Sequence, residues 1–360
     1  MKKNFTLLFF AFVSLAFSQA GAPATPYYNG FNWTLTGMNL KNALATKITT
    51  THTTNLTYSQ VWKALKIVDL DPANSSNVLL VYGWENGSDG DVTNDRSRNK
   101  NSNGGAVGDW NREHVFAQSL GNPDLGSSGP GADAQMLRSS DVQRNGTRGN
   151  RLFASGSGIN SFTVGTNGWY PGNEWKGDVA RIVMYMYLRY GSQCLPTYVT
   201  IGSTNATDSN MVDLLLQWNS EDPVSQYEDN RNTYLGNASN TYGQGNRNPF
   251  IDNPYLATVI WGGPVAENRW PAIFLSAEDF VSVENATVYP NPAINNEVYV
   301  STATELKSIV LYNINGQIIQ EIKNPSKVND AYKVSDLPKG FYLMQLATEN
   351  ASTTKKIIVN

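Results

Sequence analysis

In Trp110-Asn111-Arg112-Glu113-His114-Val115-Phe116, a carboxylate stands directly beside one of only two histidines in 360 residues. Neutral imidazole can accept a proton near neutral pH without any shift in its pKa. Zinc proteases and structural zinc sites need more nitrogen and sulfur ligands than two histidines and one cysteine provide. His next to Glu suits a general base that works beside a hard, oxygen-ligated metal ion. On this stretch alone, an ordinary packed or surface histidine is the alternative.

The N-terminus has the order of a secretory signal peptide. Lys2 and Lys3 precede an apolar run from Phe5 to Phe17, and small and polar residues follow at Ser18-Gln19-Ala20. This apolar run is too short to span a bilayer, and no later stretch reaches the necessary length. We therefore predict an exported chain without a stable membrane span, cleaved near Ser18. Loss of two lysines changes the formal net charge from −3 to −5.

Cys194 is the only cysteine, so no intramolecular disulfide can form despite export. Apolar burial, with bound ions where present, must stabilise the fold. A mature chain of about 340 residues is long enough for two domains. The acidic total argues against a surface that coats nucleic acid broadly, but it permits a local basic groove.

The first 260 residues mix helical and strand patterns. Helices are predicted from Asn39, from Ser59, and from about Glu174 to Tyr190, where Gly191 provides a stop. The apolar run 78–84 has the length of a strand. The polar, Gly- and Asn-rich stretch 85–108 is typical of an exposed loop.

The pattern changes after about Pro264. From Ala286 onward, short alternating stretches predict strands at 297–301, 308–312, 317–319, 340–346 and 355–359. Turn residues such as Asn315-Gly316 separate them. This module holds no histidine, no cysteine and no acidic cluster, so we assign catalysis to the first 260 residues. The expected fold class is α+β, followed by a small all-β sandwich.

A second informative segment runs from Asp133 to Arg151. It carries four arginines against two aspartates, and Asn145-Gly146 suggests a tight turn. Each planar guanidinium can bind two phosphate oxygens, so this density of arginine favours anion binding. A solvated loop is the alternative.

Together the two segments resemble the endonuclease I family of secreted and periplasmic nucleases, within the His-Me finger group. The family shows Glu-His-Val, Asp-x-His-Asn-Leu-x-Pro and Asn-Gly/Ser-x-Arg-x-Asn. Here these motifs read Glu113-His114-Val115, Asp133-Ala134-Gln135-Met136-Leu137-Arg138-Ser139, and Asn145-Gly146-Thr147-Arg148-Gly149-Asn150. The stretch Gln244–Asp252 matches as well, and the resemblance runs from about Tyr27 to Trp261.

The resemblance implies a His-Me finger (ββα-metal) domain and a role for each matching residue. His114 is the implied general base, while Glu113 and Asn145 hold one divalent ion, Mg²⁺ or another such as Mn²⁺ or Ca²⁺. Arg148 neutralises phosphate charge near that ion, so it joins His114 as a catalytic candidate. Further candidates for substrate binding are Arg138, Arg144 and Gln135. Ion pairing within the fold is an equal alternative for the three arginines. For Glu174, Asp178 and Arg181, which match the family too, we expect a buried salt link that holds the long helix near the site.

Some residues depart from the family pattern. Gln135 stands where the family commonly has His, and Ser139 stands where it has Pro. Phe116-Ala117 replaces a frequent Trp-Pro. These changes put a phosphate-orienting contact in doubt but leave the base and the metal ligands intact. We therefore expect reduced or altered activity rather than none.

The C-terminal module resembles the type A sorting domain of the type IX secretion system. The likeness rests on Val288-Tyr289-Pro290-Asn291-Pro292, on 310–317, on 337–342 and on the terminal Lys355-Lys356-Ile357-Ile358-Val359. It implies export across a second membrane by the type IX machinery. A carbohydrate-binding or adhesive module is the alternative. The predicted organisation is a signal peptide (1–18), a nuclease domain (26–262), a linker (263–285) and a sorting domain (286–360).

The sequence thus predicts a secreted, monomeric, metal-dependent endonuclease that cuts DNA, and RNA as well, to 5′-phosphate ends. Phosphate contacts position a substrate without reading its bases, so low sequence preference is expected. A weakened nuclease fold acting as a nucleic-acid-binding or adhesive surface protein is the rival hypothesis. A glycosidase using two acids is a further rival, but the chain carries no motif for it.

Overall fold

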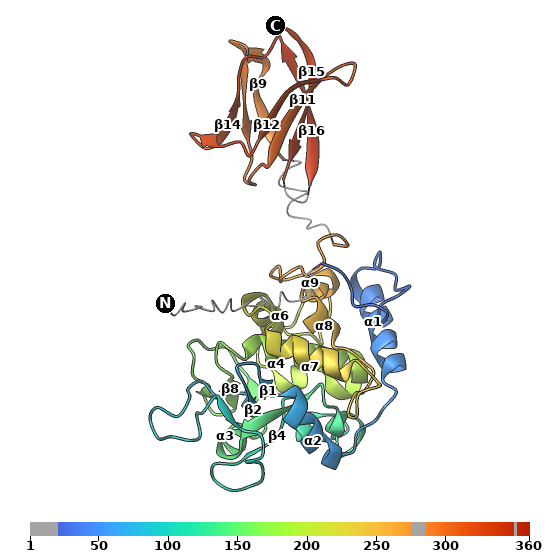
Figure 1. Cartoon of the computed structure of the whole chain (residues 1–360), viewed down its shortest axis with the longest axis vertical. Helices are drawn as coiled ribbons and strands as arrows, with labels where there is room; N and C mark the ends of the chain where they lie inside the picture. Colours follow the sequence, from blue (N-terminus) through green and yellow to red (C-terminus); the bar gives the residue numbers. More distant parts are fainter. Residues whose placement is uncertain (1–20, 275–284, 349–350) are drawn as a thin grey trace, which may run out of the picture. The chain divides into compact units, whose positions relative to one another are not determined.

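The structure is a computed structural model that describes residues 21–274, 285–348 and 351–360. The chain divides into two compact units, Met1–Arg269 and Trp270–Asn360 (Figure 1). The predicted signal peptide, residues 1–18, and residues 275–284 of the predicted linker lie outside the described residues. Within the described ranges, no helix combines the length and the apolar character needed to cross a membrane.

The first unit combines helices with three small sheets. Its helices are α1 Gly37–Thr51, α2 Tyr58–Val68, α3 Val142–Arg148, α4 Lys176–Tyr190, α5 Pro196–Val199, α6 Asp213–Glu221, α7 Gln226–Leu235, α8 Pro249–Asp252 and α9 Tyr255–Trp261, with short 3₁₀ turns η1 Gln118–Leu120, η2 Gly129–Ala132 and η3 Gly191–Cys194. Its strands are β1 Leu70–Asp71, β2 Asn74–Leu79, β3 Ser97–Asn99, β4 Trp110–His114, β5 Leu137–Asp141, β6 Leu152–Phe153, β7 Phe162–Val164 and β8 Gly168–Tyr170. The sheets have the orders β1-β2-β3, β4-β5 and β6-β8-β7.

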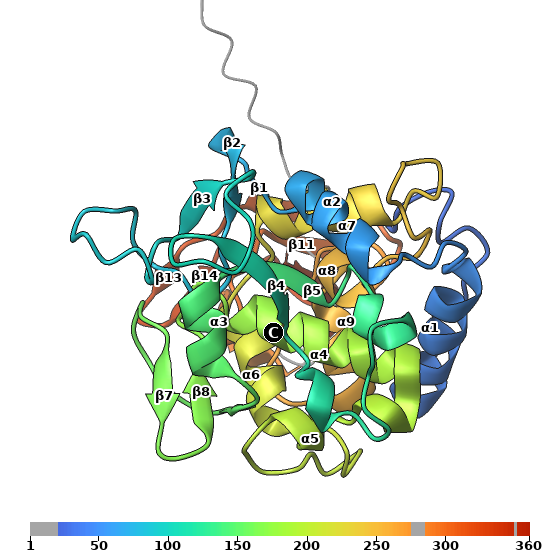
Figure 2. The same cartoon turned by 90° about the horizontal axis from the view of Figure 1, so that it is seen from below.

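The strand pair β4–β5 and the helix that follows it position the candidate site. The strands are antiparallel, with Glu113 opposite Arg138 and His114 opposite Leu137. Asp141 ends β5 and is the N-cap of α3, where its carboxylate accepts hydrogen bonds from the first free N–H groups of the helix. The helix α3 therefore lies against both strands (Figure 2). The predicted α+β class is confirmed.

The long helix α4 is buried on nearly all sides, from Gly177 to Leu188. Its charged residues are therefore paired. Arg181 Nε lies 2.6 Å from a carboxylate oxygen of Glu228, and Asp178 accepts a hydrogen bond of 2.5 Å from Arg138. This confirms the expected buried salt link for Asp178 and Arg181. For Glu174 the expectation was wrong, because it pairs with Arg96 where both side chains are partly exposed. The helix begins at Lys176, two residues later than predicted.

Several boundaries differ from the sequence-based expectations. The predicted strand 78–84 starts earlier and ends at Leu79, because the following amides donate to Arg96 and Ser139 and the chain then turns at Tyr82, whose φ is +76°. The predicted loop 85–108 contains β3, which pairs with β2. The helices α1 and α2 begin behind Thr36 and Thr57 rather than behind Asn39 and Ser59. Thr57 forms a capping box with Gln60.

The second unit is all β, as predicted. Its strands are β9 Thr287–Ile294, β10 Glu297–Ser301, β11 Ser308–Asn313, β12 Ile318–Lys323, β13 Lys327–Val328, β14 Ala331–Val334, β15 Gly340–Ala347 and β16 Ser352–Val359. They form one curled sheet with the order β12-β11-β15-β16-β9-β10-β14-β13. Two four-stranded halves are joined only where β16 pairs parallel with β9, at Val359 and Ala293.

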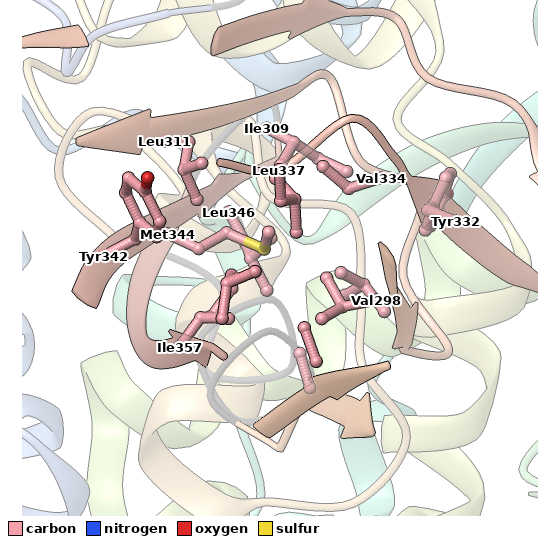
Figure 3. Packing of buried hydrophobic residues seen from close by; sticks show 14 of the residues in the cluster. Val298, Ile309, Leu311, Tyr332, Val334, Leu337, Tyr342, Met344, Leu346 and Ile357 are labelled. Atoms are coloured by element: carbon pink, nitrogen blue, oxygen red, sulfur yellow. The ribbon is translucent and has the colours of Figure 1, made fainter. Parts of the chain in front are cut away.

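Apolar side chains from both halves meet in the core of this unit (Figure 3). Ile309, Leu311, Met344 and Leu346 come from one half, and Val298 comes from the other. Alternate residues of each strand point inward, which is the period-2 pattern that predicted these strands. Strands β9, β13 and β14 were not predicted. β13 and β14 are short and lie in a polar stretch, and β9 contains Pro290 and Pro292, which interrupt a strand pattern.

Candidate active site

A pocket of about 420 Å³ lies between the end of β4, the helix α3 and the segment 117–119. Its lining consists of Arg112, Glu113, His114, Ala117, Gln118, Ser119, Asn145, Arg148, Gly149 and Asn150. Four of the seven predicted site residues are among them. The pocket therefore brings together the predicted base, both predicted metal ligands and Arg148.

Glu113 is a buried carboxylate whose two oxygens differ in their surroundings. Its Oε1 accepts a hydrogen bond of 2.8 Å from the Tyr82 hydroxyl and lies 3.1 Å from Arg148 Nη1. No described side chain donates a hydrogen bond to its Oε2. Burial raises the pKa of Glu113 to about 7, while the Arg148 charge and the Tyr82 hydrogen bond act in the opposite direction. One oxygen is thus fixed by the protein, and the other remains available to a ligand.

His114 is oriented by a backbone carbonyl. Its Nε2 lies 3.0 Å from the oxygen of Gly131, and since a carbonyl can only accept, Nε2 carries the hydrogen and Nδ1 carries the lone pair. The ring also stacks on Tyr58, with 5.6 Å between ring centroids. Burial lowers the pKa of His114, and the nearby Arg112 and Arg148 charges add to this effect. The ring is therefore neutral near neutral pH, with Nδ1 able to accept a proton.

Asn145 presents its amide from α3 toward β4. Its Nδ2 donates to Asn111 Oδ1 at 2.7 Å and to the Arg112 carbonyl at 3.4 Å. These bonds fix the side chain, and Oδ1 accepts no hydrogen bond from any described residue. The carbonyl oxygen of the amide is thus left as a second possible ligand in the pocket.

The available oxygens of Glu113 and Asn145 are the kind of donor that Mg²⁺ prefers. Within the described ranges, no three His, Cys, Asp or Glu side chains are grouped to hold a metal ion. Mg²⁺ does not require such a group, because it commonly keeps several waters and binds through one or two protein oxygens and substrate phosphate. The donor set therefore fits a hard divalent cation, and it does not fit zinc.

Arg148 stabilises the backbone at the end of β4. Its Nη1 donates to the His114 carbonyl and its Nη2 donates to the Val115 carbonyl, each at 2.8 Å. The same guanidinium pairs with Glu113, and its side chain is almost fully buried. These contacts are all internal, so the arginine holds the backbone and the carboxylate on which the pocket depends.

Comparison with known proteins supports the same region. Residues 36–255 match the family model described as Endonuclease I, which covers more than half of the chain. The chain belongs to the endonuclease I family. It is accordingly a nuclease of the hydrolase class.

Two relatives of this endonuclease I chain have names that state a substrate. An extracellular ribonuclease of Bacillus amyloliquefaciens is 44% identical over 233 residues, which cover 62% of this chain and 74% of the relative. An extracellular ribonuclease of Bacillus subtilis (strain 168) is 42% identical over 257 residues, which cover 67% of this chain and 82% of the relative.

The all-β unit has a family match of its own. Residues 287–360 match the secretion system C-terminal sorting domain, which confirms the predicted type IX sorting domain. The chain is secreted to the extracellular space or to the cell surface.

Three predicted substrate-binding residues of this endonuclease I chain lie outside the pocket lining. Arg138 is buried beside Asp178. Gln135 is buried too, and its Nε2 donates to the Asn246 carbonyl at 3.0 Å. Arg144 is half-buried, where it lies over the Trp84 ring and donates to the Thr93 carbonyl. The structure therefore does not bring these three side chains to the base and the metal ligands.

Three residues that position the site were not identified from the sequence. Tyr82 lies within the apolar run 78–84, and no residue in that run indicates that the Tyr82 hydroxyl donates to Glu113. Tyr58 stacks on His114, although an aromatic residue at a helix start usually indicates packing. Gly131 supplies the carbonyl to His114, and a Cβ there would lie 1.8 Å from the Gly126 oxygen. Only glycine can therefore occupy position 131 without a shift of the backbone.

Proposed function

We propose that this chain is a secreted, metal-dependent endonuclease that hydrolyses phosphodiester bonds in both RNA and DNA with little sequence preference. The products would carry 5′-phosphates. The names of the two Bacillus relatives favour RNA as a substrate. For DNA, the support is chemical, because attack on the phosphate by a water that His114 deprotonates does not need the ribose 2′-hydroxyl.

One observation carries the proposal. His114 has its Nε2 hydrogen directed at the Gly131 carbonyl, so its free Nδ1 belongs to the same pocket as the carboxylate of Glu113 and the amide of Asn145. A neutral imidazole with a free nitrogen is suited to accept a proton from water. A module that only binds nucleic acid has no need for a base in this arrangement.

Glu113 and Asn145 would hold the divalent ion, Mg²⁺ being the best fit to two oxygen donors. When bound, such an ion stabilises charge on a phosphate oxygen and on the leaving 3′ oxygen. His114 Nδ1 takes a proton from the attacking water, and the Gly131 carbonyl stabilises the imidazolium that forms. Arg148 keeps Glu113 and the His114 backbone in place through its buried ion pair and hydrogen bonds.

The departures at Gln135 and Ser139 affect buried positions rather than the pocket lining. We therefore propose an active enzyme in preference to a weakened, purely binding fold.

Digestion of plasmid DNA and of a structured RNA, with Mg²⁺ and with EDTA, tests the function. The wild-type protein should cut both substrates only with the divalent ion. His114→Ala should lower kcat by about 10²- to 10⁴-fold, which is the usual contribution of general base catalysis. His52→Ala is the matched control, because it removes the only other histidine and lies outside the pocket lining.

Two results would count against the proposal. Equal cleavage by wild type and His114→Ala would remove His114 as the base. Tight binding of DNA and RNA by the wild type, without cleavage in any divalent ion, would favour the rival binding module.

A further inference from the structure

Arg112 differs from the other charged residues in the pocket, because its guanidinium has no carboxylate partner among the described residues. Arg148, the second arginine of the lining, is paired with Glu113. Arg112 Nη1 donates to the Tyr58 carbonyl. Its Nε is buried without a hydrogen-bond partner, and no described group accepts a hydrogen bond from Nη2. An unsatisfied donor and an unneutralised charge at this place are costly in the free protein.

Two aromatic rings hold this guanidinium in position. Arg112 Cζ lies 3.4 Å from the centroid of the Tyr58 ring and 4.5 Å from that of the Trp62 ring. Tyr58 and Trp62 are four residues apart on α2, so they form one face of that helix. Stacking of this kind orients the guanidinium plane before a ligand binds, which lowers the entropic cost of binding.

The position of Arg112 on β4 relates it directly to the base. Arg112 and His114 are two residues apart on the strand, and the same Tyr58 ring contacts both side chains. Both also line the pocket. A ligand that is cleaved next to His114 would therefore have its neighbouring anionic group within the reach of Arg112.

We propose that Arg112 binds a phosphodiester of the nucleic-acid strand adjacent to the one that is cleaved, using the unoccupied Nη2 donor and the charge of its stacked guanidinium. This assignment rests on the proposed nuclease function of the same pocket. The bound phosphate supplies the negative charge and the acceptor atoms that the free protein lacks. Arg112 is then a substrate-binding residue that sets affinity and register, and it takes no proton in the reaction.

The test is the salt dependence of binding to a fluorescein-labelled single-stranded DNA of fixed sequence, measured by anisotropy in EDTA so that cleavage does not interfere. Each phosphate that a protein neutralises on a single strand contributes about 0.7 to the slope of log K against log salt concentration. Arg112→Gln should reduce that slope by about 0.7 and should weaken binding at low salt. Lys63→Gln is the matched control, because it removes one exposed positive charge from α2 and lies outside the pocket lining.

Arg112→Lys separates a binding role from a structural one. Lysine keeps the charge, so it should restore most of the slope while losing the stacked, planar geometry of the guanidinium. In Mg²⁺, Arg112→Gln should raise KM more than it lowers kcat. A slope for Arg112→Gln equal to that of the wild type would overturn the proposal, even if the variant unfolds at a lower temperature. An equal loss of slope in Lys63→Gln would also overturn it, because the effect would then be one of net charge.

Failure of the Arg112 phosphate site can be distinguished from failure of the proposed nuclease function. If His114→Ala cleaves like the wild type but Arg112→Gln still loses slope, the phosphate site stands and the assignment of the base fails. If His114→Ala is inactive and the slope of Arg112→Gln is unchanged, the function stands and the Arg112 site fails.

Discussion

Tyr82 adopts an unusual backbone conformation next to the pocket. Its φ is +76°, although it is a bulky residue and fully buried. Such a conformation costs roughly 1–3 kcal/mol and persists only where the surroundings enforce it. The Tyr82 hydroxyl donates a hydrogen bond to Glu113. The next residue is Gly83, and glycine is required there because a Cβ would lie 2.1 Å from the Asp95 backbone oxygen. The strained turn thus delivers one hydrogen bond to the proposed metal ligand.

Tyr82→Phe should weaken metal binding while leaving the fold intact. The variant keeps the packed ring but leaves Oε1 of Glu113 with Arg148 as its only side-chain partner. Loss of a group that orients a metal ligand typically costs about 10- to 100-fold in metal affinity. Titration with Mn²⁺, followed by electron paramagnetic resonance without substrate, measures this directly.

Tyr28→Phe is the matched control for Tyr82→Phe. The Tyr28 hydroxyl also donates to a buried carboxylate, that of Asp252 at 2.7 Å, but it lies outside the pocket lining. It should leave Mn²⁺ affinity unchanged. Equal affinities for the Tyr82→Phe variant and the wild type would show that Arg148 alone suffices to position Glu113.

Among the elements, α3 depends on a single residue at its start. The Asp141 carboxylate caps the helix through Oδ1, and its Oδ2 accepts a hydrogen bond of 2.7 Å from the buried Arg98. The same short helix carries Asn145 and Arg148 into the pocket. Asp141 therefore contributes both to the stability of the β4–β5 strand pair and to the geometry of the site.

Two substitutions of Asp141 should separate the contribution of the helix cap from that of the ion pair with Arg98. Asp141→Asn keeps a capping oxygen but loses the ion pair, whereas Asp141→Ala loses both. Breaking a buried ion pair costs about 3–5 kcal/mol. The cost is smaller here, because Arg98 keeps a second partner in Asp95. Loss of the helix cap costs about 1 kcal/mol more. Urea unfolding should therefore rank the free energies of unfolding as wild type, then Asn, then Ala. Equal values for the two variants would mean that the cap adds nothing.

The elements also show what sequence patterns could predict. Helices with periodic apolar residues, such as α1, α2 and α4, were identified because periodicity reports a buried face directly. The pocket residues Glu113, His114, Asn145 and Arg148 came from the resemblance to the family. Strand β3 and the turn at Tyr82 were missed, because both depend on contacts with residues distant in sequence. The same holds for Arg138, whose partner Asp178 is 40 positions away.

In the molecule as a whole, buried ion pairs accompany an apolar core that contains no disulfide. Cys194 is buried and free. The first unit instead encloses arginine–carboxylate pairs that connect distant segments, among them Arg98–Asp141, Arg138–Asp178, Arg148–Glu113, Arg181–Glu228 and Arg231–Asp69. Composition alone could not predict this, because charges are normally assigned to the surface. Such pairs specify which segments meet, although each gives little net stability.

The division into two units predicts that the nuclease is complete without the sorting domain. Every pocket residue lies between positions 112 and 150, the endonuclease match ends at 255, and the sorting match begins at 287. A chain that ends after Phe274 should therefore keep the kcat/KM of the full chain on RNA and the same unfolding temperature for its first unit. The same truncation carrying His114→Ala should be inactive, which excludes a contaminating nuclease. A truncated protein that folds but has lost activity would mean that residues beyond 274 contribute to catalysis, and the assignment of all chemistry to the first unit would then be wrong.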